Sequence, residues 1–340
     1  MLDSDTMGKT SFSSALLRWF AQHGRELPWR GIDDPYGIWV SEVILQQTRI
    51  DQGRDYWLRF MQRFPSVEAL AAASEDEVLR LWQGLGYYSR ARNMHAAARQ
   101  IVEQGGFPCN IEGLRALKGV GDYTAAAVGS MAFGLHAAAV DGNVYRVLAR
   151  HFGIDVPINT TRGKHTFEAL AAELLPQGQA SAFNQAMMDF GATWCTPRSP
   201  RCLDCPVDET CEALRTGRVS QLPVKEKKLK VQQRRFTYIY VRHQGMTALR
   251  RRPAGGIWQG LWEPLLVEDG PLPDLGCTLT LLASGVKHVL THRVLLADFY
   301  LAEPAVRPAL PDGYRWVKEA SVGDYALPRL VERLLETLPR

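Results

Sequence analysis

Two spacings of apolar residues divide the chain. In its first part they recur every three or four positions, as in Phe12, Leu16 and Phe20, which indicates amphipathic helices. After residue 235, short segments rich in β-branched and aromatic residues alternate with clusters of Gly, Pro and Asp, which indicates strands and turns. The pattern predicts an all-α portion followed by a smaller α+β domain.

A basic segment separates the two patterns. Residues 218–235 contain seven Lys and Arg side chains, one proline and a single acidic residue, Glu226. A solvated linker explains such a run as well as a nucleic-acid contact does. We therefore expect a helical domain over 1–215, a linker over 216–232 and a second domain over 233–340, with strands at 236–241, 286–291 and 294–301 and a closing helix at 328–338.

Composition argues against a membrane protein but leaves the partner open. Of the 340 residues, 46% are hydrophobic, which is enough for two sizeable cores. Residues 1–10 have no apolar stretch like that of a signal peptide, and the longest uncharged run, 123–140, is mostly alanine, so we expect a cytoplasmic protein. Residues 1–215 hold 21 basic and 24 acidic side chains, against 19 and 12 in the remainder. Charge alone therefore does not indicate a nucleic-acid partner.

Four of the six cysteines lie in one short segment. Cys195, Cys202, Cys205 and Cys211 follow the spacing Cys-x6-Cys-x2-Cys-x5-Cys. Four converging thiolates would repel one another unless a cation neutralised them, so the spacing predicts a metal centre in the 195–211 loop. Zinc and a 4Fe-4S iron–sulfur cluster both take four thiolates, so spacing alone leaves the metal open. Disulfides are less consistent with a large chain that has no secretion signal.

A glycine-containing turn separates two expected helices. Gly119 and Gly121 stand just before a helix that begins near Asp122. Glycines permit a sharp turn and leave the N–H groups of the next helix open to a phosphate. The segment therefore looks like a helix–hairpin–helix motif, which grips one DNA strand without reading its sequence. Most Gly-Val-Gly tripeptides are ordinary turns, but here Asp141 follows the second helix.

Two carboxylates are candidate catalysts. Glu42 lies in the apolar run 39–45 with no cation in the run, and a carboxylate in such surroundings tends to keep its proton, as a general acid requires. An exposed helix glutamate is the competing interpretation of Glu42. A helix N-cap is the competing interpretation of Asp141. The residues alone leave both alternatives open.

The order of these features resembles a known superfamily. Over residues 12–215, the hairpin motif, an aspartate and the cysteine loop follow one another as in the endonuclease III superfamily of DNA glycosylases. Four segments, at 27–29, 41–48, 84–88 and 183–189, look like those of the MutY-type adenine glycosylases. The resemblance implies a 4Fe-4S cluster in the cysteine loop. It also implies excision of adenine from double-stranded DNA after the base has been flipped out of the helix.

The resemblance also implies roles for single residues. Glu42 would protonate the adenine ring and Asp141 would stabilise the cationic sugar, with Tyr123 and Asn143 hydrogen-bonding beside them. Bifunctional relatives carry a lysine at the position of Tyr123, and a phenol cannot form a Schiff base, so we expect a monofunctional enzyme. The remaining implied contacts are Trp29, Arg30 and Gln185 in the adenine pocket, and Gln46, Gln47, Thr48, Tyr87, Gly119 and Gly121 on DNA.

Residues 233–340 resemble, more weakly, the Nudix-like domain with which this family recognises 8-oxoguanine. The likeness rests on residues 252–253, 260–263 and 288–292, and it implies that Thr291 and His292 contact DNA. The Arg-Glu-x-x-Glu-Glu core of Nudix hydrolases is missing, which argues against pyrophosphatase activity. We therefore expect a monomer that acts on adenine opposite 8-oxoguanine or guanine. A thymine- or uracil-removing relative and a non-catalytic damage sensor are the alternatives.

Overall fold

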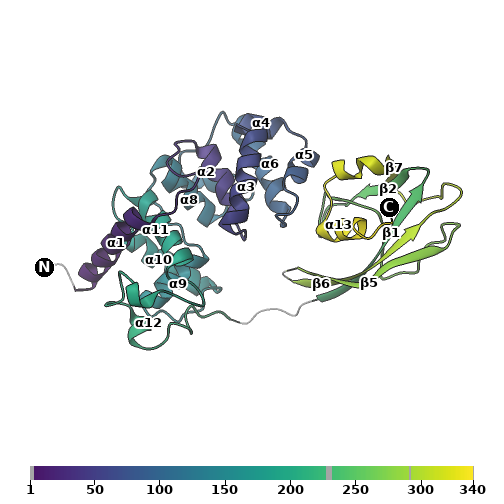
Figure 1. The fold of residues 1–340 in the computed structure, drawn as a ribbon. Helices are drawn as coiled ribbons and strands as arrows, with labels where there is room; N and C mark the ends of the chain where they lie inside the picture. Colours follow the sequence, from purple (N-terminus) through teal and green to yellow (C-terminus); the bar gives the residue numbers. More distant parts are fainter. Residues whose placement is uncertain (1–3, 227–231, 291, 340) are drawn as a thin grey trace. The chain divides into compact units, whose positions relative to one another are not determined.

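The computed structural model describes residues 4–226, 232–290 and 292–339, with side chains from residue 9 onward. It divides into two compact units (Figure 1). Residues up to 71 together with 96–227 form the first unit, and 72–95 together with 228–340 form the second. The predicted domain boundaries at 215 and 233 stay predictions, because the second unit also contains part of the helical portion.

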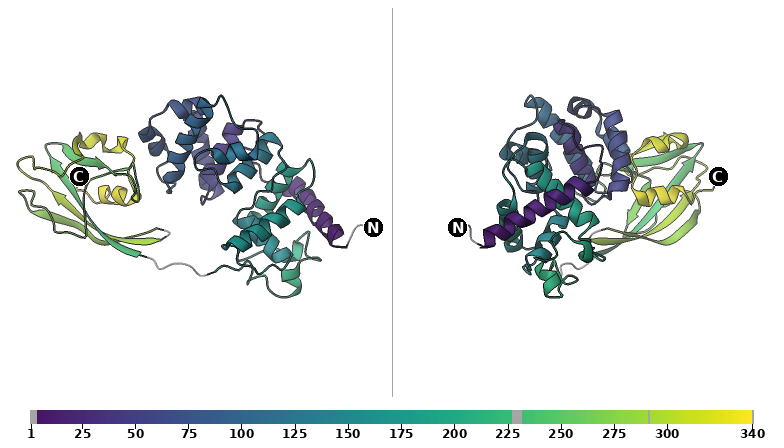
Figure 2. Two further views of the ribbon diagram at one scale, coloured as in Figure 1. Left: turned by 180° about the vertical axis from the view of Figure 1, so that it is seen from behind. Right: turned by 60° about the vertical axis from the view of Figure 1, so that its left-hand side comes forward.

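The first unit is built from helices, which Figure 2 shows from two further sides. The chain returns to it from the second unit within α6 (Ser89–Glu103). Its other elements are α1 (Ser4–His23), α2 (Pro35–Leu45), α3 (Ile50–Arg63), α4 (Val67–Ala72), α7 (Ile111–Ala116), α8 (Asp122–Phe133), α9 (Gly142–His151), α10 (Thr161–Leu174), α11 (Ala180–Thr193), η1 (Cys202–Asp204) and α12 (Glu212–Arg215).

Side chains from four of these helices form one continuous core. Phe12 and Leu16 of α1 cluster with Leu148 of α9, Phe167 of α10 and Phe190 of α11, and none of the five is more than 2% exposed. Burying each such side chain contributes about 1.5–3 kcal/mol to folding. This core fixes α9 and α11 against each other, and both helices carry residues of the candidate site.

Over its described residues, the second unit contains a mixed seven-stranded sheet. The long strand β1 pairs in parallel with β6 and antiparallel with β2 and β4, so it organises the sheet. β6 also pairs antiparallel with β5, and β2 pairs with β3 and β7. The strands are β1 (Gln232–His243), β2 (Met246–Arg251), β3 (Trp262–Glu263), β4 (Leu265–Glu268), β5 (Leu279–Val289), β6 (Arg293–Ala302) and β7 (Tyr314–Lys318).

Helix α13 (Arg329–Leu335) covers one face of this sheet (Figures 1 and 2). Its Leu330 and Leu334 are fully buried in the same cluster as Tyr238 and Phe299. The opposite face carries a smaller cluster. The unit also contains α5 (Glu75–Leu81) and η2 (Glu319–Asp324).

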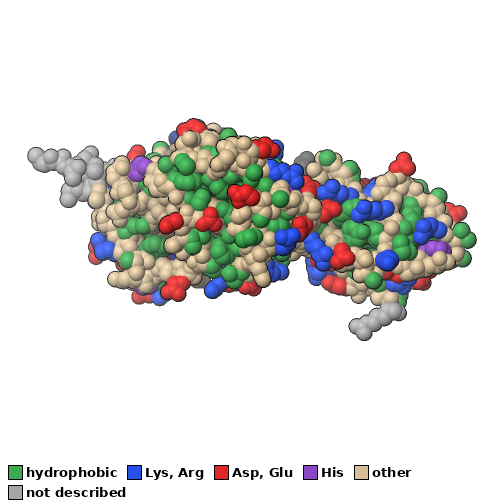
Figure 3. Space-filling view, turned by 90° about the horizontal axis from the view of Figure 1, so that it is seen from above, with side chains coloured by type: hydrophobic (Ala, Val, Ile, Leu, Met, Phe, Trp, Pro, Cys, Tyr) green, Lys and Arg blue, Asp and Glu red, His purple; other side chains and the backbone are tan. Residues whose placement is uncertain are grey.

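The predicted order, an all-α portion followed by a smaller α+β domain, is confirmed. The three predicted strands correspond to β1, β5 and β6, which are longer, whereas the short strands β2, β3, β4 and β7 were missed. The closing helix is shorter than expected. Among the described residues, no helix combines the length and the apolar character needed to cross a bilayer. On the face drawn in Figure 3, acidic and basic side chains are interspersed on both units.

Candidate active site

The helical unit contains a pocket of about 720 Å³. It collects side chains that lie far apart in the sequence and includes every predicted catalytic and adenine-pocket residue. The predicted residues that line it are Trp29, Arg30, Glu42, Thr48, Tyr123, Asp141, Asn143 and Gln185. The pocket is therefore the candidate active site.

Glu42 is buried in the wall of this pocket. Helix α2 is capped by Asp34, which accepts the backbone N–H groups of Tyr36 and Gly37 at 3.0 Å each, and its residues 36–44 are all buried. The glutamate is only 7% exposed. Its interpretation as an exposed helix glutamate is therefore wrong.

The surroundings of Glu42 favour its protonated form. Burial has the largest effect and raises the pKa of this carboxyl to about 7, with a further contribution from the charge of Asp141. A hydrogen bond from the Tyr123 hydroxyl, 2.7 Å from Oε2, and the charge of Arg30 act in the opposite direction. The sequence run around Glu42 has no cation, but the fold brings Arg30 near. Glu42 is thus largely protonated below about pH 7, where an ordinary glutamate is ionised.

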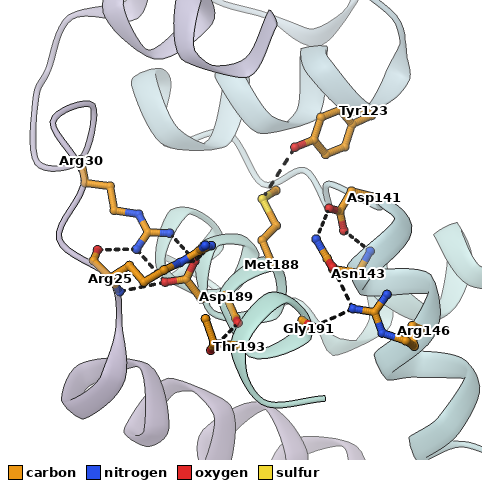
Figure 4. A network of polar contacts seen from close by, with 10 residues as sticks. All are labelled: Arg25, Arg30, Tyr123, Asp141, Asn143, Arg146, Met188, Asp189, Gly191 and Thr193. Atoms are coloured by element: carbon orange, nitrogen blue, oxygen red, sulfur yellow. Dashed lines mark hydrogen bonds and ion pairs between the residues drawn. The ribbon is translucent and has the colours of Figure 1, made fainter. Parts of the chain in front are cut away.

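Tyr123 lies near the start of α8, directly after the glycine turn. Burial first, and then the charges of Glu42 and Asp141, raise the pKa of its hydroxyl well above the usual value, so it stays a neutral hydrogen-bond donor. The hydroxyl also contacts Met188 Sδ at 3.7 Å (Figure 4). Lys118, on the other side of the turn, is exposed.

Asp141 is the N-cap of helix α9. Its Oδ1 accepts the backbone N–H groups of Asn143 and Val144, and its Oδ2 accepts Asn143 Nδ2, all at 2.8 Å (Figure 4). Burial raises the pKa of Asp141, although these hydrogen bonds and the charge of Arg146 oppose the shift. The capping interpretation therefore describes the geometry correctly. Since the side chain also lines the pocket, capping and a role in the pocket are compatible.

Arg146 holds Asn143, which in turn donates to the Asp141 carboxylate. The sequence did not predict this role for Arg146. Its guanidinium donates to Asn143 Oδ1 at 2.8 Å, to the carbonyl of Gly191 at 2.6 Å and to that of Cys195 at 2.8 Å. A Cβ atom at Gly191 would lie 2.5 Å from the Cβ of Asn143. Helix α11 can approach α9 this closely only because residue 191 is glycine.

A buried ion-pair cluster forms another part of the wall (Figure 4). Asp189 of α11 is fully buried and accepts hydrogen bonds from both Arg25 and Arg30. Arg30 was expected in the pocket, whereas Arg25 and Asp189 were not. The sequence did offer one signal, because Asp189 is the single charged residue in the apolar run 186–192. A buried charge needs a partner, so this run predicts a cation nearby.

The hairpin turn keeps the start of α8 accessible. Gly119 has φ of +78°, which favours glycine, whereas Gly121 is the extended N-cap of α8. A Cβ atom at Gly121 would meet no heavy atom within 4 Å. Nothing in the fold itself requires glycine at 121, so its lack of a side chain is consistent with close approach by a ligand.

The predicted DNA contacts after α2 form a tight turn. Gln46 Nε2 donates to Thr124 Oγ1 at 3.3 Å, and the N–H of Thr48 bonds to the carbonyl of Leu45 at 3.1 Å. Gln47 is exposed and has φ of +59°, a left-handed conformation that side chains rarely adopt. Such strain at an exposed residue is typical of functional sites.

Three other predicted DNA contacts belong to the second unit. Tyr87 is 47% exposed and also left-handed, with φ of +45°. His292 is exposed beside the turn between β5 and β6, where Leu290 and Arg293 exchange backbone hydrogen bonds. Thr291 lies outside the described residues.

The four clustered cysteines surround one small space. They line a cavity of about 30 Å³, and none of the chain's six cysteines forms a disulfide. Burial, and then the charges of the other three cysteines, raise the pKa of Cys205 to about 12, while Arg150 Nη1 lies 3.4 Å from Cys195 Sγ. Within the described part of the chain, no three His, Cys, Asp or Glu side chains form a ready-made metal group. The donor set nevertheless suits a thiophilic centre, whose charge would remove the repulsion among the thiolates.

Two protein families match parts of the chain. Residues 40–177 match the family described as "HhH-GPD superfamily base excision DNA repair protein", and residues 237–337 match "NUDIX domain". An adenine DNA glycosylase of Buchnera aphidicola is 33% identical over 255 residues, which cover 74% of this chain and 72% of the relative. The chain belongs to the adenine DNA glycosylase family. The mouse adenine DNA glycosylase is 44% identical over 236 residues, covering 65% of this chain, but the match spans only 46% of the mouse protein.

Solved structures share the fold of the helical part of this adenine DNA glycosylase family member. A thermostable thymine-DNA glycosylase is 31% identical, with a TM-score of 0.59, and the match covers 63% of this chain and all of that chain. A non-covalent endonuclease III–DNA complex, 22% identical, has a TM-score of 0.55 over 64% of this chain and 99% of that chain, which shows the fold alone.

Proposed function

We propose that this protein is a monofunctional adenine DNA glycosylase that acts in base excision repair. It hydrolyses the N-glycosidic bond of an adenine that has been flipped out of double-stranded DNA. The observation that carries the proposal is the convergence of Glu42, Tyr123 and Asp141 in one pocket, with the Glu42 pKa near 7. A carboxyl group with a pKa near the operating pH, together with a second carboxyl group in the same pocket, suits acid-assisted glycoside cleavage.

Glu42 acts as the general acid. Its proton passes to a ring nitrogen of the flipped adenine, which makes the base a better leaving group. Asp141, held by Asn143 and by the N-H groups of α9, stabilises the positive charge that develops on the sugar. A water molecule then adds to the sugar carbon, and the proton it loses returns to Glu42.

The enzyme is monofunctional because the pocket has a phenol where a lyase needs an amine. Tyr123 donates its hydrogen bond to Glu42 and cannot attack the sugar to form an imine. Lys118 precedes the hairpin turn in the sequence and is exposed. Excision therefore leaves an intact strand with an abasic site.

Binding of the base and of the strand uses two groups of residues. Trp29, 7% exposed and packed on Trp57, provides an aromatic wall, while Arg30 and Gln185 supply polar contacts to the adenine edge. The hairpin glycines present backbone N–H groups to a phosphate. Gln46 and Gln47 fill the space in the duplex that the flipped base leaves, and Thr48 adjoins them. Tyr87 also contacts DNA.

Cys195, Cys202, Cys205 and Cys211 hold a 4Fe-4S cluster. The fit rests on four free thiols around one cavity, a donor set that suits a thiophilic centre. When bound, the cluster neutralises the thiolates and fixes the 195–211 loop. Arg146 and Arg150 contact that loop through the carbonyls of Cys195, Thr196 and Pro197, so a fixed loop also steadies helix α9.

The Nudix-like domain recognises 8-oxoguanine opposite the target adenine through Thr291 and His292. Support comes from the match of residues 237–337 to the Nudix family and from the exposure of His292 next to the β5–β6 turn. The protein acts as a monomer on A:8-oxoguanine or A:G mispairs in the cytoplasm, where it associates with chromosomal DNA.

A panel of duplexes tests this function. Adenine is placed opposite 8-oxoguanine, G, C and T, and thymine opposite G, with hot alkali used to reveal abasic sites. We expect single-turnover cleavage of A:8-oxoguanine and A:G, with breaks only after alkali. Preferential removal of thymine from T:G would instead support the thymine-removing alternative, and binding without excision on every duplex would support a damage sensor.

A further inference from the structure

One buried carboxylate holds two arginines of the pocket wall. Asp189 accepts five hydrogen bonds: from Arg25 N at 2.9 Å, Nε at 3.0 Å and Nη2, and from Arg30 Nη1 at 2.8 Å and Nη2 at 2.7 Å. Figure 4 shows the two guanidinium groups converging on this carboxylate from the segment that precedes α2. A further hydrogen bond restrains the Arg30 side chain: its Nη1 also donates to the carbonyl of Arg25 at 2.7 Å.

The cluster carries an unbalanced charge. Asp189 is completely buried, while the side chains of Arg25 and Arg30 are 27% and 17% exposed, and all three line the pocket. Burial tends to raise the pKa of Asp189, but the hydrogen bonds from Arg30 and Arg25 outweigh it and hold the pKa below its usual value. The carboxylate therefore stays ionised, and two positive charges face one negative charge.

We propose that Asp189 is a positioning residue of the pocket, which fixes Arg25 and Arg30 in its wall and cancels one of their two charges beside Glu42. The proposal rests on the proposed function for its meaning in catalysis. Truncating a residue that accepts five hydrogen bonds would release both arginines, whose long side chains have many other conformations. Without the carboxylate, the pocket would hold a net charge one unit more positive.

That additional charge acts on the general acid. The groups that act on Glu42 are the Tyr123 hydroxyl from α8, the Asp141 carboxylate before α9 and the Arg30 guanidinium. Other charged side chains in the pocket lining are Asp33, Arg49 and Asp51. A nearby cation stabilises an ionised carboxylate, so unbalanced arginines would make Glu42 lose its proton at lower pH.

Two variants change the wall charge in opposite directions, and a third restores it. Asp189→Asn keeps the size and one acceptor oxygen but leaves two uncompensated arginines. We expect the fall in single-turnover rate at high pH, which reports loss of the Glu42 proton, to move about one pH unit lower, so the rate at pH 8 drops about tenfold. Arg25→Gln should move the fall to higher pH. The double variant Arg25→Gln/Asp189→Asn restores the net charge and should return the profile toward that of the native protein.

The matched control is Asp155→Asn, which removes an exposed carboxylate 3.1 Å from Arg218 Nη2, and its profile should not change. A rate lowered equally at every pH by Asp189→Asn, or an unchanged midpoint in Arg25→Gln, would overturn the proposal. Arg25→Gln alone decides the matter if Asp189→Asn does not fold.

A second readout does not depend on activity. The Glu42 carboxyl can be titrated by NMR in protein with carbon-13-labelled glutamate, with Glu42→Gln used for assignment. The midpoint should fall in Asp189→Asn and rise in Arg25→Gln. If the native protein removes no adenine from any duplex, the proposed function fails, whereas equal midpoints in all variants would contradict the charge balance itself.

Discussion

Replacing Asp141 by Asn separates its structural role from its proposed catalytic role. The carboxylate caps α9 through Oδ1, which accepts two backbone N–H groups at 2.8 Å, and a side-chain amide retains such an acceptor. Asn and Asp are equally good N-caps, whereas Ala costs about 0.5–2 kcal/mol of stability. The helix start should therefore survive in Asp141→Asn and weaken in Asp141→Ala.

The charge of Asp141 also affects stability. Burial raises its pKa in the folded protein, so its contribution to stability is fully present below the unfolded-state pKa of about 3.9 and is lost as the pH rises through the folded-state value. Near neutral pH the buried charge is a net cost, and Asn removes it. We expect Asp141→Asn to be at least as stable as the native protein at pH 7.

The catalytic activity of Asp141→Asn should fall although its stability does not. Loss of the charge that meets the cationic sugar should slow adenine excision at least about 100-fold in Asp141→Asn. Stability is measured by urea unfolding and activity by single-turnover excision from an A:8-oxoguanine duplex. The matched control is Thr160→Ala, which removes the cap of α10, where Thr160 Oγ1 accepts the N–H of Gly163 at 3.0 Å. It should lose about 1 kcal/mol and keep its excision rate.

A nearly native rate of adenine excision by Asp141→Asn would contradict a catalytic role for the charge of Asp141. If Asp141→Ala loses stability but keeps its excision rate, as Thr160→Ala is expected to do, Asp141 would be only a helix cap.

Three further predictions concern the cluster, the lyase step and the second domain. The purified protein should be brown with four iron atoms, as four thiolates imply, and Cys202→Ser should be unstable; one zinc atom and no visible absorbance would contradict this. Borohydride should trap almost no protein on DNA, since Tyr123 replaces an amine; efficient trapping that Lys118→Ala abolishes would refute it. Thr291→Ala should reduce the ratio of excision rates opposite 8-oxoguanine and G about tenfold, the value of one base-edge contact; an unchanged ratio would exclude Thr291 as the reader.

Sequence reasoning predicted the helical portion because its apolar periodicity is long and regular. It missed β2, β3, β4 and β7, which contain two to six residues each and therefore too few positions to show alternation. Their place in the sheet comes from pairing with distant partners, such as β2 with β7. Long-range pairing of this kind leaves no local signal.

The residues of the candidate site also fall into those that the sequence predicted and those that it did not. Glu42, Tyr123 and Asp141 stand in recognisable motifs, and the structure brings them into one pocket. No role was assigned from the sequence to Arg25, Asp189 or Arg146, which set their surroundings, although Asp189 ends the 183–189 segment. Arg25 contacts Asp189 across 164 positions, and Arg146 contacts Gly191 across 45. Their contribution is the electrostatic balance of the pocket, which depends on three-dimensional proximity.

Adenine removal by the Glu42 pocket is the central claim, and identifying the released base tests it most directly. Native protein and Glu42→Gln are each incubated in excess with a duplex that contains all four normal bases and a single A:8-oxoguanine pair, and free bases are measured by mass spectrometry. The account predicts one adenine released per duplex by the native protein and at least about 100-fold slower release by Glu42→Gln, which should still bind the duplex. Release of thymine, or equal adenine release by Glu42→Gln, would contradict it.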